Sequence, residues 1–165
     1  NYLLSCTNQD NVLWSNGIVV GFLMRVDRVH PNTVPHVWQL VKPLIDKALK
    51  YSNGEHLGSD LLQPLLEGNY CLLLGIDDNE CIISAIVCKI NIYAQKKSLF
   101  VITWAVDTGH GYDEWSDLFE NKLIEIGHES GCSYLETWCR KGLAKKMSKY
   151  HGWTDKYAVA TKKIL

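Results

Sequence analysis

The feature that most constrains the fold is a strand–helix–strand order in the last third of the chain. Residues 99–106 are apolar and β-rich, a helix is predicted from about residue 113 to residue 130, and residues 133–139 form another strand. Two strands joined through such a helix lie parallel, and the crossover is right-handed. The sequence therefore predicts a mixed sheet that includes a parallel pair.

The helix of this unit has a clear amphipathic pattern, because apolar residues recur at helical spacing and predict a buried stripe. The stripe consists of Trp115, Leu118, Phe119, Leu123 and Ile126. Gly131 suits the left-handed residue that often follows a helix. A basic helix over residues 142–150, ended by Gly152, and a strand over residues 157–164 complete the C-terminal part.

The first third of the chain predicts one strand and two helices. Residues 23–29 alternate apolar and charged side chains, as a half-buried strand does. Pro35 opens a helix, and the interior Pro43 is expected to kink or split it. Ser59 is expected to cap a short second helix that is closed by Gly68.

A β-meander is predicted between these two parts. Residues 70–76 and 81–93 are β-rich runs joined by acidic and amide residues typical of a hairpin turn, so we expect them to pair antiparallel. Residues 99–106 add a third strand. Alternation predicts that three of its large side chains share one face: Phe100, Ile102 and Trp104.

These elements indicate a single domain of the mixed α/β class, with helices on both faces of the sheet. The 165 residues suffice for one hydrophobic core. We expect residues 23–165 to form the domain and residues 1–22 to form an N-terminal appendage, in which residues 18–20 can add an edge strand.

Charge and cysteine usage exclude several classes of function. The formal net charge of -1 provides no field for general nucleic-acid binding. The apolar run over residues 17–24 is too short to span a bilayer, so no membrane segment is expected. The 6 cysteines include no C-x-x-C pair, which indicates reduced thiols and a cytoplasmic protein. No His or Cys spacing indicates a metal site.

A glycine-containing loop is the first candidate site. Gly109 and Gly111 stand between a predicted strand and a predicted helix, where backbone N–H groups and the helix dipole favour an anion. Alternatively, both glycines serve only the strand-to-helix turn. The spacing alone favours this alternative, because a lone G-x-G is weak evidence.

Several short motifs resemble those of a known family. They are Val37-Trp38, Pro43-Leu44, Leu66-Glu67-Gly68, Trp115, Gly131-Cys132 and Arg140-Lys141-Gly142-Leu143. Together with the element order, they resemble the GNAT superfamily of acyl-CoA-dependent N-acyltransferases from about Met24 to Leu165, and in particular a phage-encoded GNAT-like subfamily. The resemblance implies the GNAT fold, a central mixed β-sheet of about six or seven strands flanked by about four helices.

The resemblance also implies acetyl-CoA as cosubstrate, bound where the fourth and fifth strands splay apart. The residues that it assigns to acetyl-CoA are Val106, Asp107, Thr108, Gly109, Gly111, Arg140 and Lys141. An amine on a protein, a peptide or a small molecule would attack the thioester directly. Neither nucleic acid nor a membrane is expected as a partner.

The catalytic positions depart from the superfamily's pattern. Its loop reads Q/R-x-x-G-x-G/A at the helix start, where this chain has Glu114 and Trp115. Its proton-donating tyrosine falls on Ser148, a poor proton source. Glu136 is a candidate general base, because burial in its strand would raise the pKa of its carboxyl; a surface position is an equal alternative. His110 is a candidate that acts through a water. The alternative, that a histidine between two glycines is simply exposed, is the commoner case.

Two functions therefore fit the sequence. The first is an acyl-CoA-dependent N-acyltransferase that transfers an acetyl group to an amine. The second is a catalytically degenerate GNAT-fold protein that binds a partner or serves as a phage structural or accessory protein, in the host cytoplasm or the virion. A fold alone does not decide between them.

Overall fold

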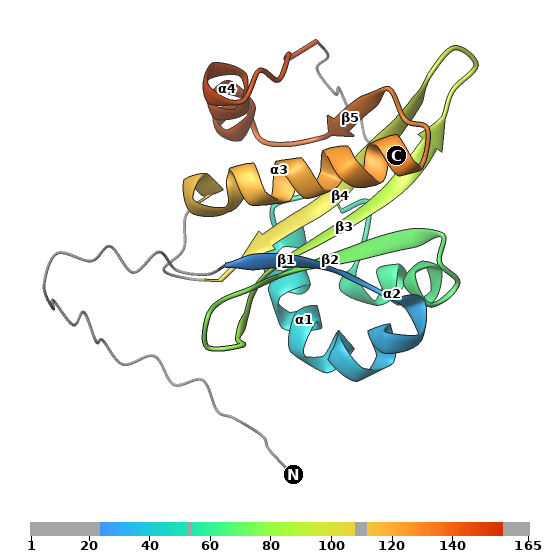
Figure 1. The fold of residues 1–165 in the computed structure, drawn as a ribbon, viewed down its shortest axis with the longest axis vertical. Coiled ribbons are helices and arrows are strands. Elements are labelled where there is room, and N and C mark those ends of the chain that lie inside the picture. Colours follow the sequence, from blue (N-terminus) through green and yellow to red (C-terminus); the bar gives the residue numbers. More distant parts are fainter. Residues whose placement is uncertain (1–23, 53, 108–111, 157–165) are drawn as a thin grey trace, which may run out of the picture.

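The chain folds around a mixed sheet that has five strands in the described residues, in the order β1-β2-β3-β4-β5 (Figure 1). The computed structural model describes residues 24–52, 54–107 and 112–156. The elements are β1 (Arg25–Val29), the 3-10 turn η1 (Pro31–Thr33), α1 (Val34–Leu49), α2 (Gly58–Leu66), β2 (Tyr70–Ile76), β3 (Ile82–Ile92), β4 (Lys97–Val106), α3 (Tyr112–Glu129), β5 (Tyr134–Thr137) and α4 (Lys141–Tyr150). The strands predicted at 18–20 and 157–164 lie outside the described residues.

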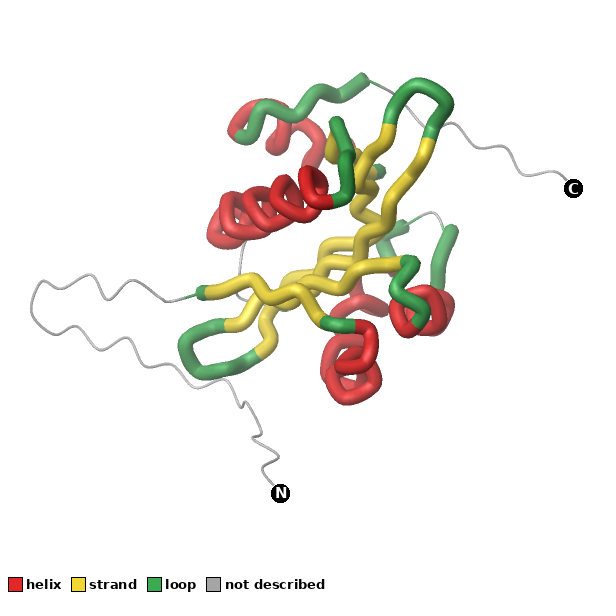
Figure 2. The backbone as a smooth tube through the Cα atoms, turned by 45° about the vertical axis from the view of Figure 1, so that its right-hand side comes forward, coloured by secondary structure: helices red, strands yellow, loops and turns green. Residues whose placement is uncertain are grey.

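Helices cover both faces of the sheet, as the sequence predicts (Figures 1 and 2). On one face α1 and α2 pack in a core where Ile45 and Leu72 are fully buried. On the other face α3 contributes Trp115 and Phe119 to a second core with Ile86 of β3. The sheet is therefore packed between two apolar layers, one on each face. Among the described residues, no helix is long and apolar enough to cross a membrane.

The β2–β3 hairpin is antiparallel, as predicted. Asp77 Oδ1 accepts hydrogen bonds from the backbone N–H groups of Asn79 at 2.9 Å and Cys81 at 2.8 Å. An Asp side chain that bonds its own backbone two residues on mimics a backbone turn. The acidic and amide run between the two strands thus closes the hairpin.

The interior Pro43 does not split α1, which runs unbroken from Val34 to Leu49. A proline removes one backbone donor and crowds the preceding turn. The buried face of α1 offsets this cost by packing on the sheet, and it consists of Val34, Trp38, Val41, Ile45 and Leu49.

The start of α2 differs from the prediction. Asp60 Oδ2 accepts the backbone N–H of Leu57 at 2.7 Å. Asp60, rather than the expected Ser59, therefore makes the side-chain contact at this helix start. The end is as predicted, because Gly68 follows α2 with a φ of +73°, which a residue with a side chain rarely adopts.

Four of the five residues predicted for the buried stripe of α3 are buried, and Leu118 is not. Leu118 is 39% exposed because it lies at the edge of the stripe centred on Trp115, Phe119 and Ile126. Gly131 ends the helix with a φ of +67°, as predicted.

A β-bulge in β4 changes which of its side chains share a face. The register of β3 and β4 shifts between the pairs Val87–Thr103 and Cys88–Val101. Ile102 consequently packs toward the α1 core, whereas Trp104 joins the α3 core. The prediction that Phe100, Ile102 and Trp104 share one face is wrong for Trp104, because a bulge inserts one residue and breaks the alternation.

Candidate functional site

The parallel pairing of β4 and β5 is confirmed, and it stops half-way along β4. Only four residue pairs form, from Ser98–Tyr134 to Val101–Thr137. Thr137 Oγ1 donates a hydrogen bond to the Val101 carbonyl at 3.1 Å where the pairing stops. Beyond this point β4 continues to Val106 while β5 has ended, so the two chain segments diverge.

A cavity of about 180 Å³ lies at this divergence, between the two strands, α4 and the end of α1. Its lining is mostly apolar and aromatic. The lining residues are Ala48, Leu49, Tyr51, Ser52, Val101, Ile102, Thr103, Trp104, Leu123, Thr137, Trp138, Cys139, Arg140, Leu143, Met147 and Trp153. Small-molecule sites have this character, with few polar groups among many apolar ones.

Aromatic side chains border the cavity. Trp104 lines it. Trp138 is 64% exposed and meets Phe100 edge-on, with ring centroids 5.3 Å apart. Arg140 lies over the Tyr51 ring, 4.7 Å from its centroid. Among the described residues that line the cavity, Arg140 is the one that carries a charge, and its guanidinium faces Tyr51 just after α1.

The Nε1–H of Trp153 is the most distinctive polar group here. It is buried and has no hydrogen-bond partner among the described residues. Its side chain lines the cavity. An unsatisfied buried donor costs about 1–3 kcal/mol, so it is available to an acceptor atom that enters the cavity.

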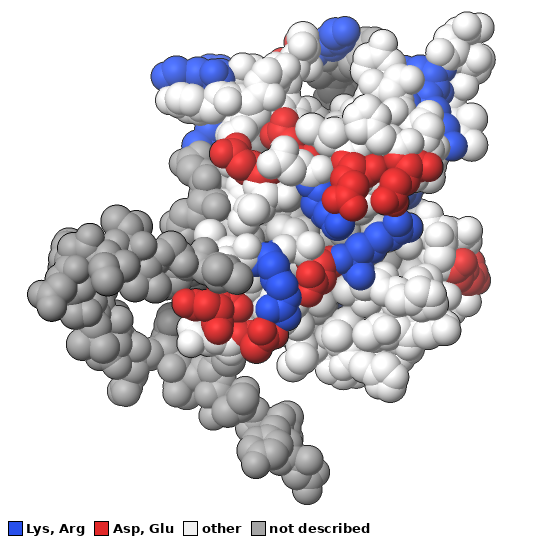
Figure 3. All heavy atoms as spheres, viewed as in Figure 1, with Lys and Arg blue, Asp and Glu red and all other residues white. Residues whose placement is uncertain are grey.

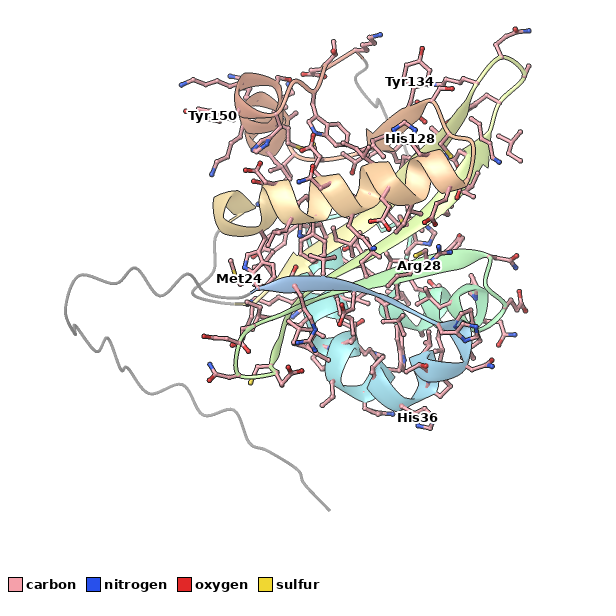
Figure 4. All side chains as sticks on the ribbon, in the orientation of Figure 1. Met24, Arg28, His36, His128, Tyr134 and Tyr150 are labelled. Carbon is pink, nitrogen blue, oxygen red and sulfur yellow. The ribbon has the colours of Figure 1, made fainter. Side chains whose placement is uncertain are left out.

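A second, more open hollow of about 350 Å³ lies between the first turns of α3 and the end of α4. It is lined by Ser116, Asp117, Lys146, Tyr150 and His151. His151 Nδ1 is 3.4 Å from Asp117 Oδ1 and 3.7 Å from Glu120 Oε2, which joins the end of α4 to α3. Figure 4 labels Tyr150, the last residue of α4.

The predicted loop site is only partly described. Thr108, Gly109, His110 and Gly111 lie outside the described residues. Val106 ends β4 opposite Ser84. Asp107 is exposed, and its backbone N–H donates to the Ile83 carbonyl at 2.8 Å.

Glu136 lies in β5 opposite Phe100, within the paired part of the strands and outside the cavity lining. One carboxylate oxygen contacts Lys96 Nζ, and the other accepts from Ser98 Oγ at 2.5 Å and Tyr93 OH at 3.0 Å. Burial raises the pKa of this carboxyl, but the three hydrogen bonds and the Lys96 charge outweigh it and lower the pKa. The expected rise in the pKa of Glu136 is therefore wrong, because the β3–β4 hairpin supplies donors that favour the ionised form.

The lowered pKa makes a pH-dependent prediction. Because the folded-state pKa lies below the ordinary value, ionised Glu136 stabilises the fold fully above about pH 4.3 and less as pH falls through the folded-state pKa. We expect Glu136→Gln to lower the melting temperature at pH 7, and this difference from wild type to shrink below about pH 4. Thermal melts across pH would measure it. A difference that does not change with pH would contradict it.

The remaining predicted site residues lie on α4. Lys141 is its first residue and is exposed. Ser148 is exposed and lines neither the cavity nor the hollow. Sequence reasoning missed Tyr51 and Trp138 at the cavity mouth, and Trp153 within it. The signal that could have found them is their aromatic side chains, because aromatic residues commonly line small-molecule sites.

Comparisons with known proteins bear on the fold. No protein-family model matches the chain, and no curated protein matches it by sequence. Among solved structures, the chain is similar to a probable acetyltransferase, with a TM-score of 0.67 and 12% identity over 86% of this chain and 98% of that one. It is also similar to the aminoglycoside N-acetyltransferase AAC(6')-Iy in complex with CoA, with a TM-score of 0.65 and 13% identity over 89% and 98%.

A third similar structure is a GCN5-related N-acetyltransferase from Ralstonia eutropha, with a TM-score of 0.65 and 12% identity over 85% of this chain and 98% of that one. These likenesses define the class of fold, which is the GNAT fold of the acetyltransferases. At such identities they define the fold alone.

Proposed function

We propose that the chain is an acyl-CoA-dependent N-acyltransferase that transfers an acetyl group from acetyl-CoA to an amine. The observation that carries the proposal is the apolar cavity where β4 runs on past the end of β5. Beyond Val101, the edge of β4 has no β5 residue to pair with. The amide groups of a pantetheine arm can pair with such an edge as a short strand would.

The reaction needs few protein groups once both reactants are held together. The amine nitrogen attacks the thioester carbonyl carbon, negative charge develops on the carbonyl oxygen, and the C–S bond then breaks to release the thiolate. The amine loses one proton and the thiolate gains one. We propose that Trp153 Nε1–H donates to the developing negative charge, because it is a buried donor in the cavity lining that has no hydrogen-bond partner among the described residues.

The other roles are proposals drawn from the family resemblance. Glu136 and His110 are the proposed proton acceptors, and Ser148 is the proposed hydrogen-bond donor at the thiolate. Val106, Asp107, Thr108, Gly109 and Gly111 would bind the pyrophosphate, with Arg140 and Lys141 near the adenosine phosphates. In the structure the Arg140 guanidinium contacts the Tyr51 ring, so it lies on the α1 side of the cavity.

The similar structures support this choice of substrates. One of them is an aminoglycoside N-acetyltransferase in complex with CoA. For this chain the proposed acceptor is an amine on a small molecule, a peptide or a protein.

A binding titration tests the proposal directly. Acetyl-CoA at about 100 times its dissociation constant should stabilise the protein by about 2.7 kcal/mol, measured as a shift of the thermal unfolding midpoint. ADP is the matched control, because it carries a pyrophosphate without the pantetheine arm. Equal shifts with ADP and acetyl-CoA would contradict insertion into the cavity, and no shift with either would contradict the acyl-CoA proposal.

A Trp153→Phe variant separates binding from chemistry. Phenylalanine keeps an aromatic ring in the cavity but removes the N–H, so kcat should fall about 100-fold while KM for acetyl-CoA changes little. Trp38→Phe is the control, because Trp38 is buried on α1 and does not line the cavity. Steady-state kinetics with both variants would measure the effect. An unchanged kcat for Trp153→Phe would exclude Trp153 from the reaction.

A second candidate function is a non-catalytic GNAT-fold protein that binds a partner, including a phage accessory role. It is favoured by the exposed Ser148 and by the lowered pKa of Glu136, since neither suits proton transfer at neutral pH. Acetyl-CoA binding without acetylation of any amine in a broad panel would support this second candidate. Turnover with one amine would exclude it.

A further inference from the structure

Two cysteines that do not line the cavity lie directly opposite each other on neighbouring strands of the sheet. Cys71 of β2 and Cys88 of β3 are cross-strand partners. Both belong to the core on the α3 side of the sheet. Directly opposed residues in antiparallel strands have Cα atoms about 4.5 or 5.5 Å apart, and both separations lie in the range that a disulfide spans.

The two thiols have different surroundings. Cys88 is fully buried, whereas Cys71 is partly exposed. Arg28 of β1 lies near Cys71, and Arg28 Nη1 is 3.4 Å from Glu129 Oε2 of α3. Figure 4 labels Arg28 on β1, and Figure 3 shows acidic side chains over α3 above basic side chains on the strands beneath. Cys71 therefore lies beside an ion pair at the edge of the core.

These surroundings give the two thiols opposite reactivity. A hydrogen bond from Cys88 is the largest cause that lowers the pKa of Cys71, to about 7. Burial raises this pKa, and the positive charge of Arg28 lowers it. The same hydrogen bond, together with burial, raises the pKa of Cys88. At neutral pH Cys71 is thus about half thiolate, which is the nucleophilic form, whereas Cys88 keeps its proton.

We propose that Cys71 and Cys88 are a redox-active pair that a hydroperoxide converts into a disulfide between β2 and β3. The thiolate of Cys71 attacks a peroxide oxygen, the O–O bond breaks, and sulfenic acid and hydroxide (or an alkoxide) form. Cys88 Sγ then attacks Cys71 Sγ, and the displaced hydroxide leaves as water with the proton of Cys88. The two cysteines lose two electrons in total, and the peroxide gains two.

The disulfide would form beside the proposed acyl-CoA site without belonging to it. Cys88 pairs with Val101 on its other side, where the β-bulge begins and the cavity lining starts. Cys132 is the competing partner, because its charge acts on Cys88 and it packs on the same core. Cys139 serves as a comparison, since it is exposed but its pKa is raised by burial and by Asp155.

Mass spectrometry of the full-length protein tests the pairing without any activity assay. Reduced protein is treated with one equivalent of hydrogen peroxide, alkylated and cleaved after Glu67, Glu80 and Lys89. Cys71 then lies in the peptide of residues 68–80, and Cys88 lies in that of residues 81–89. We expect the two peptides to be joined, with a loss of about 2 Da relative to the separate thiols, and dithiothreitol to release them.

Variants identify the sulfurs. Cys71→Ser and Cys88→Ser should each abolish the link, and Cys88→Ser should leave a sulfenic acid on Cys71 that dimedone traps. Cys81→Ser, Cys132→Ser and Cys139→Ser should leave the link intact. Unlinked peptides in wild type, or a link that requires Cys81 or Cys132, would overturn the proposal. The readout does not depend on acyl-CoA binding.

Discussion

Replacing Gly75 by alanine is expected to lower the free energy of unfolding by about 2 kcal/mol or more. A Cβ at Gly75 would lie 2.8 Å from Trp115 Cζ3 and 3.0 Å from both Phe119 Cζ and Ser84 Cβ. Trp115 and Phe119 are fully buried, so neither ring can swing into solvent. Equilibrium denaturation, followed by two probes to verify a two-state transition, would measure the loss.

Gly142→Ala is the matched control for the Gly75 variant. A Cβ at Gly142 meets nothing within 4 Å, and Gly142 is the second residue of α4. Alanine there should therefore stabilise the protein by a few tenths of a kcal/mol, up to about 1. Equal destabilisation by the two alanines would show that the packing of Trp115 is not the cause.

A double-mutant cycle tests the contact itself. Trp115→Leu alone leaves a cavity and should cost about 3 kcal/mol. It also removes the closest of the three atoms that the new Cβ would meet, so Gly75→Ala should cost less in the Trp115→Leu background. Strictly additive losses would contradict the close approach, because neighbours that share a contact do not add.

The sequence predicts most of the fold because the fold depends on regular patterns. Helical periodicity in α3 and alternation in β1 place the buried faces, and turn chemistry at Asp77 places the hairpin. Glycines at Gly68 and Gly131 mark two helix ends through their positive φ angles. Each of these signals lies within a short window of the chain.

The parts that sequence reasoning missed depend on contacts between distant residues or on local irregularity. The β-bulge that turns Trp104 toward α3 has no glycine or proline to mark it. The pKa of Glu136 depends on Lys96 and Tyr93, which precede it by about forty residues in the sequence. The β3–β4 turn places both side chains next to its carboxylate. Trp138 directly follows β5 and is exposed, as is Tyr134 at the start of the strand, so alternation alone does not place these aromatic side chains in a core.

Filling the cavity with a larger side chain is expected to have the largest effect on turnover. Leu143→Trp should lower kcat/KM for acetyl-CoA on the order of 100-fold, since a misplaced thioester loses near-attack geometry. Leu143 is half-buried on α4 and lines the cavity, so a larger ring there would occupy the space between β4 and the segment after β5. The same variant should weaken the thermal shift produced by acetyl-CoA.

Lys145→Trp separates a filled cavity from a general effect of tryptophan on α4. Lys145 is exposed on the same helix and does not line the cavity, so its replacement places an equal ring in solvent. We expect the two variants to unfold at similar temperatures without ligand and to differ only in acetyl-CoA binding and turnover. Because α4 borders the cavity through Leu143 and Met147, equal kinetics for both variants would mean that the thioester binds elsewhere.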